Sequence, residues 1–138
     1  MEYNPVADSF VATDYSYLYS ARGYRGAYGW IRGLGTPPTP HLDVLLLTAS
    51  QRLRHGDLIE ASICGIFWRA DGDHKLVAAA DDIPLPAGRT PDWDALPPAW
   101  HSQLLAIFPR LDPGEGWFGR ERALDYLRRC RDQGLDPR

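Results

Sequence analysis

Residues 58–80, which read LIEASICGIFWRADGDHKLVAAA, are the stretch that indicates the fold most clearly. From Leu58 to Arg69, aliphatic and aromatic residues alternate imperfectly with small or polar ones, which is typical of a long β-strand. Asp71-Gly72-Asp73 is a tight-turn sequence, and the chain is apolar again from Leu76 to Ala80. The stretch therefore predicts a β-hairpin.

The residues before this hairpin predict further strands. Residues 41–48 (HLDVLLLT) are a short apolar run bounded by turn signals, which indicates a buried strand. Residues 33–40 (GLGTPPTP) hold three prolines and predict a loop. Aromatic residues interleaved with glycines crowd the first thirty positions, which favours two short strands joined by a glycine-rich turn. In that segment Tyr15, Tyr17 and Tyr19 would share one strand face.

Two helices are expected near the carboxyl end. One follows Pro97-Pro98 and ends at Pro109, and its apolar residues recur at helical spacing. The other runs from Arg120 to Arg131, with one apolar face and charged residues elsewhere. Strands followed by helices predict an α+β domain, and 138 residues suit a single domain spanning 1–138.

Composition and charge exclude several classes of partner. Lys and Arg number 15 against 18 Asp and Glu, a net charge of -3, which argues against nucleic acid. The longest aliphatic run, Val44 to Leu47, is far too short for a membrane span, and the start Met-Glu-Tyr-Asn-Pro does not look like a signal peptide. We therefore expect a cytoplasmic protein that binds neither nucleic acid nor membrane. Cys64 and Cys130 form no redox or metal motif.

Five blocks of the sequence, in this order, resemble the soluble inorganic pyrophosphatase family. The resemblance implies a five-stranded OB-like antiparallel β-barrel flanked by two helices, in agreement with the order of strands and helices above. The blocks are Tyr28-Gly29-Trp30-Ile31, residues 42–48 (LDVLLLT), residues 56–61 (GDLIEA) with Gly65-Ile66, residues 73–78 (DHKLVA) and residues 115–119 (EGWFG).

The resemblance implies magnesium-dependent hydrolysis of pyrophosphate. In the family, several Asp carboxylates hold the metal ions, while Lys, Arg and Tyr side chains bind the phosphate oxygens. The family signature Asp-x-Asp-Pro-x-Asp-Val falls on residues 38–44 (PTPHLDV), so Asp43 is its remaining carboxylate. Asp73 and Lys75 match the Asp and Lys of the later hairpin, Asp71 is a candidate for its other Asp, and Tyr28 matches the phosphate-binding Tyr.

Other functional positions of the family are changed in this chain. Glu2 and Ser16 stand where the family has a Lys and an Arg, and Phe108-Pro109 stands where it has a Tyr-Lys pair. The family's N-terminal metal-binding Glu would fall before Met1. Pyrophosphate with its metals needs oxygen ligands and cations together. We therefore expect a ligand that is less charged and more apolar than pyrophosphate.

Each candidate residue also has a plainer interpretation. Asp43 and His41 lie two apart and could form an acid–base pair, or His41 could be a surface residue at the end of a loop. Asp73 and Lys75 could share the site or form an exposed ion pair. Tyr28 could donate a hydrogen bond to a ligand or simply pack in the core.

The leading hypothesis is a diverged pyrophosphatase-fold protein that uses the old site for another small molecule, by new chemistry or by binding, with no cofactor. One alternative is a weak diphosphatase in which Mg²⁺ is held by Asp43, Asp71 and Asp73. The other is a noncatalytic regulatory or structural homologue. We also expect some form of homo-oligomer.

Overall fold

The expected hairpin organises the sheet. A computed structural model describes residues 9–14, 26–32, 34, 41–49, 57–84 and 91–133. Strand β4 (Leu58–Trp68) runs antiparallel to β5 (Lys75–Ala80), with an irregularity in register between Ile63 and Gly65. Gly72 turns the chain with a φ of +84°, a conformation that glycine adopts without strain. The hairpin predicted over 58–80 is therefore confirmed.

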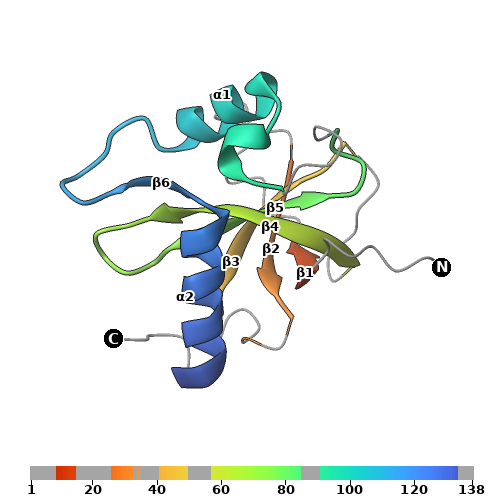
Figure 1. Cartoon of the computed structure of the whole chain (residues 1–138), viewed down its shortest axis with the longest axis horizontal. Coiled ribbons are helices and arrows are strands. Elements are labelled where there is room, and N and C mark those ends of the chain that lie inside the picture. The colour runs from red at the N-terminus through yellow and green to blue at the C-terminus, as the bar shows by residue number, and fades with distance from the viewer. Residues whose placement is uncertain are drawn as a thin grey trace.

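The remaining strands curl around this hairpin in a mixed sheet (Figure 1). They are β1 (Ser9–Asp14), β2 (Ala27–Ile31), β3 (Asp43–Leu47) and β6 (Gly116–Gly119), in the order β1-β2-β3-β5-β4-β6. Because β1 pairs with both β2 and β4, the first five strands have the pairings of a partly open OB-like barrel.

Two details of the predicted sheet are wrong. The pairing of β3 with β5 is parallel, so the sheet is mixed rather than antiparallel, since β4 lies between them in the chain and reverses direction. A sixth strand, β6, extends the edge beyond β4. Its four residues begin and end with glycine, a pattern that does not indicate a strand before its partner is known. The expected alternation of Tyr15, Tyr17 and Tyr19 lies outside the described residues.

Both predicted helices are confirmed (Figure 1). Each contributes buried side chains to one of two apolar clusters. Helix α1 spans Pro98–Ile107, after the short 3₁₀ helix η2 (Trp93–Ala95), and α2 spans Arg120–Gln133. Strand β3 is apolar at successive positions because its residues point alternately into the two clusters. Val44, Leu46, Ala123, Tyr126 and Leu127 belong to the α2 cluster, and Leu45, Leu47, Leu104 and Ile107 to the α1 cluster.

Asp92 joins η2 to α2. Its Oδ1 accepts hydrogen bonds from the backbone N–H groups of Trp93, at 2.7 Å, and Arg120, at 3.0 Å, so one carboxylate satisfies donors at the starts of two helices.

No helix in the described part of the chain is long and apolar enough to cross a membrane.

Gly65→Ala tests the pairing of β4 with β6. A Cβ at Gly65 would lie 2.6 Å from the backbone oxygen of Phe118, so one strand must shift. We expect a loss of about 1–3 kcal/mol in the free energy of unfolding, measured by urea denaturation. Gly116→Ala is the matched control, because its Cβ would meet only the Phe118 ring, at 3.7 Å. Equal stability of the two variants would contradict this account of the edge.

Candidate functional site

The parallel pairing of β3 and β5 brings two of the predicted site residues together. Asp43 and Lys75 are the first residues of their strands and face each other in the register. The Lys75 Nζ donates hydrogen bonds to the carboxylates of Asp43 and, at 3.0 Å, Asp73. The Lys75 and Asp43 side chains are only 5% and 8% exposed, whereas that of Asp73 is 55% exposed. The ion pair of Lys75 with Asp43 is therefore buried, and Asp73 connects it to solvent.

His41 and Tyr28 approach the same carboxylate. The Nε2 of His41 lies 2.7 Å from Oδ1 of Asp43, and the His41 side chain is 23% exposed. Tyr28, on β2, contributes a side-chain hydrogen bond to Asp43. Trp30 on β2 is the register partner of Asp43 on β3. The Trp30 and His41 rings are arranged edge to face, with 6.4 Å between their centres. The tertiary structure thus gathers four predicted residues around Asp43.

Burial and hydrogen bonding act in opposite directions on this ion pair. Burial alone would raise the pKa of Asp43, but hydrogen bonds from Lys75 and Tyr28 and the nearby positive charges lower it below its usual value. Burial alone would lower the pKa of Lys75, but Asp43 and Asp73 raise it. Both groups are therefore charged at neutral pH.

Asp71, the other predicted metal ligand, has contacts within its own turn. Its Oδ1 accepts a hydrogen bond from the Asp73 backbone N–H at 2.9 Å, which lowers the pKa of Asp71. Its other oxygen lies 3.6 Å from the Arg69 guanidinium. Asp71 therefore stabilises the turn.

Three residues beside the site were not predicted. His74 is buried, and its Nδ1 accepts a hydrogen bond from the Arg69 backbone N–H at 2.9 Å. Burial lowers the pKa of His74. Glu115 accepts hydrogen bonds from the backbone N–H groups of Ala70, at 2.8 Å, and Asp112, at 2.9 Å. The position of Arg69 and His74 within the 58–80 hairpin was the signal that could have pointed to these two residues. Glu115 had no such signal, because its hydrogen bond with Ala70 joins residues 45 positions apart.

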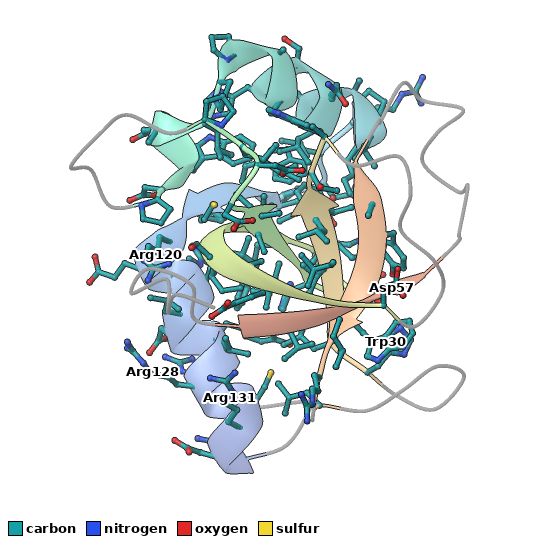
Figure 2. The ribbon with its side chains drawn as sticks, turned by 90° about the vertical axis from the view of Figure 1, so that its right-hand side faces the viewer. Trp30, Asp57, Arg120, Arg128 and Arg131 are labelled. Carbon is teal, nitrogen blue, oxygen red and sulfur yellow. The ribbon has the colours of Figure 1, made fainter. Side chains whose placement is uncertain are left out.

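Three described cavities lie along α2, and their lining residues do not include Asp43, Asp73 or Lys75. One of about 600 Å³ is lined by Asp92, Asp94, Phe118, Arg120 and Arg128, among others. Figure 2 shows Arg120 and Arg128 along α2, with Trp30 on the other side of the view. Within the ranges that the structure describes, no three His, Cys, Asp or Glu side chains are grouped so as to hold a metal ion.

Similarity to solved structures agrees with this arrangement of strands and helices. An inorganic pyrophosphatase from Neisseria gonorrhoeae is 25% identical, with a TM-score of 0.55 over 75% of this chain and 65% of that chain. One from Helicobacter pylori is 19% identical, with a TM-score of 0.61 over 93% of this chain and 94% of that chain. This chain has a pyrophosphatase-like fold. A third, from Coxiella burnetii, is 19% identical, with a TM-score of 0.54 over 76% of this chain and 70% of that chain.

The pyrophosphatase-like fold confirms the sequence resemblance at the level of architecture. The chain spans just under two thirds of the length of the Neisseria protein. No protein-family model and no curated protein matches its sequence. At 19–25% identity the residues of the site must be judged on their own chemistry.

The buried ion pair predicts a defined dependence of stability on pH. Because folding lowers the pKa of Asp43, this carboxylate contributes to the free energy of unfolding. The contribution is complete above the usual carboxyl pKa and is lost as pH falls through the lowered pKa. The raised pKa of Lys75 gives a contribution that is complete below the usual ammonium pKa and is lost as pH rises through the raised one. The free energy of unfolding should therefore be greatest between these two limits.

Lys75→Met should cost about 3 kcal/mol of folding stability at pH 7, because it leaves the Asp43 charge buried without its ammonium partner. Acidification neutralises that carboxylate, so the difference from the unsubstituted protein should shrink as pH falls. Urea denaturation between pH 3 and 8 measures both effects. The double variant Asp43→Asn with Lys75→Met should be more stable than Lys75→Met alone at pH 7. If the stability difference between Lys75→Met and the unsubstituted protein did not change with pH, the assignment of Lys75 and Asp43 as a buried ion pair would be contradicted.

Proposed function

We propose that this protein is a diverged member of the pyrophosphatase fold that no longer hydrolyses pyrophosphate efficiently. Its site around Asp43, Asp73 and Lys75 instead serves a small molecule that is less charged and more apolar. The observation that carries this proposal is the Lys75 ammonium, which bonds both carboxylates at once.

The carboxylates fit a magnesium ion poorly. Mg²⁺ demands oxygen ligands in near-octahedral geometry at about 2.0–2.1 Å. The Oδ2 atoms of Asp43 and Asp73 both accept from Lys75, so the ammonium lies where a cation shared by the two would be. Asp71 is engaged by its turn. In our proposal Lys75 neutralises these carboxylates in place of a metal ion.

The charge of the cluster also disfavours pyrophosphate. Before His41 is counted, Asp43, Asp73 and Lys75 leave a net charge of -1. Pyrophosphate carries several negative charges and needs an excess of cations around its oxygens. A less charged ligand meets less repulsion in this cluster.

His41 and Asp43 supply the chemistry that the cluster can perform. One imidazole nitrogen of His41 lies 2.7 Å from the buried carboxylate of Asp43, close enough for the two groups to act together on a bound molecule. His41 is the more exposed of the two and would exchange a proton with a bound molecule, while Asp43 holds it in place. Tyr28 would donate a hydrogen bond, and Lys75 would stabilise negative charge on the ligand or on Asp43.

A weak Mg²⁺-dependent diphosphatase is the second candidate. The fold it shares with the named pyrophosphatases supports it, as does the convergence of Asp43, Asp73, Lys75 and Tyr28. In that case Asp43, Asp73 and Asp71 would have to release their present partners to bind metal.

Release of phosphate from pyrophosphate with Mg²⁺ separates the two candidates. We expect turnover no higher than the uncatalysed background, with a bacterial inorganic pyrophosphatase as positive control. Asp43→Asn tests the site, and Asp125→Asn on α2 is the matched control, because Asp125 is exposed and pairs with Arg129 at 2.9 Å. Robust turnover that Asp43→Asn abolishes and Asp125→Asn retains would establish the diphosphatase instead.

A thermal-shift panel of metals, nucleotides and metabolites tests whether the site binds small molecules. We expect at least one small organic molecule to raise the melting temperature of the unsubstituted protein and of Asp125→Asn, but not that of Asp43→Asn. If no compound stabilises the protein, a noncatalytic role in binding another macromolecule is favoured.

A further inference from the structure

Arg69 follows β4 directly, and its backbone is held on several sides. Its N–H donates to His74 Nδ1 at 2.9 Å, and its carbonyl oxygen accepts from the Gly72 N–H at 3.1 Å. The next residue, Ala70, donates its N–H to Glu115 at 2.8 Å. The start of the Arg69 side chain therefore occupies a fixed place beside Asp73.

An aromatic stack lies against the other end of this side chain. The Arg69 Cζ is 5.5 Å from the centre of the Phe108 ring, which stacks on Phe67 at 4.3 Å with 2° between the rings. Glu115 also accepts from the Asp112 N–H at 2.9 Å, which ties the segment after α1 to the hairpin turn. A guanidinium over an aromatic face is restricted in orientation without losing any N–H donor.

The guanidinium itself is only weakly engaged. Its contacts with carboxylates are ion pairs of 3.6 Å to Asp71 and 3.6 Å to Asp73, well beyond the roughly 2.7–2.9 Å of a charge-assisted hydrogen bond. Both carboxylates have other donors, since Asp71 accepts from the Asp73 N–H and Asp73 accepts from Lys75. They can release Arg69 without becoming unpaired.

Exposure distinguishes the two cations beside Asp73. The Arg69 side chain is 31% exposed, whereas that of Lys75 is 5% exposed and bonds two carboxylates. Of these two cations, Arg69 is therefore the one that a ligand can reach from solvent, and Lys75 remains with Asp43.

We propose that Arg69 is the anion-binding residue of this site, and that the ligand carries a single carboxylate group which the guanidinium fork receives through two N–H donors. This inference rests on the proposed function, because it names the ligand class of the same site. Asp43, Asp71, Asp73 and Glu115 with Arg69 and Lys75 already sum to a net charge of -2, before His41 is counted. A carboxylate adds one negative charge, whereas a phosphate monoester adds about 1.5–2 and is repelled more strongly.

Three probes of similar shape test the ligand class: benzoate, phenyl phosphate and benzamide. Titrating each into the ¹⁵N-labelled full chain while following the amide NMR signals of residues 69–75 gives three dissociation constants. We expect benzoate to bind saturably at these residues, at least about tenfold more tightly than either other probe, because it alone combines one negative charge with a fork-shaped acceptor.

Variants of Arg69 assign the contact. Arg69→Gln should weaken benzoate about tenfold and leave benzamide unchanged, and Arg69→Lys, which keeps the charge but loses the fork, should lie between. Arg129→Gln on α2 is the matched control, because Arg129 is exposed and pairs with Asp125. Thermal melting checks that each variant folds, and Arg69→Lys serves as the test if Arg69→Gln does not.

Three results would overturn the inference: no saturable benzoate shift at residues 69–75, tightest binding of phenyl phosphate, or unchanged benzoate affinity in the folded Arg69 variants. None of these bears on Mg²⁺-dependent release of phosphate from pyrophosphate. Failure of this inference is therefore distinguishable from failure of the proposed function.

Discussion

The buried ion pair of Lys75 with Asp43 is the interaction on which the arrangement of the site depends. Two opposite charges out of water are tolerated only with good geometry and further hydrogen bonds, which Asp73 and Tyr28 supply. The pair forms because β3 and β5 run in parallel and start at the same level of the sheet. The register of the two strands thus fixes where the two charges meet.

The pyrophosphatase-like fold and the chemistry of this site are separate findings. Likeness to the Neisseria, Helicobacter and Coxiella proteins is carried by the arrangement of strands and helices, at 19–25% identity. The cluster around Asp43 depends on a few side chains, and replacing a few carboxylates and cations changes what a cavity can bind without altering the sheet around it. Under the function proposed above, the Lys75 ammonium, which donates to both Asp43 and Asp73, takes the place of a divalent cation.

Much of the fold was predictable because its signals are local. The hairpin over 58–80, the apolar strand before it and both helices follow from periodicity, turn residues and prolines. Strand β6 was not predictable, because residues 116–119 become a strand only through pairing with β4. Asp43, Asp73, Lys75, Tyr28 and His41 were predicted and do lie together. The turn at Asp71 was predicted, but the hydrogen bond that its carboxylate accepts from the Asp73 N–H appears only in the structure.

By itself the sequence determined the α+β class, the order of the elements and the residues that could carry chemistry, because propensity and spacing act over a few positions along the chain. Tertiary structure decided which charges meet. Lys75 and Asp43 are 32 positions apart, and Ala70 and Glu115 are 45 apart. Strand register and burial decide whether two such groups meet in a buried ion pair, bond within a turn or stay partly exposed. No local pattern encodes register or burial.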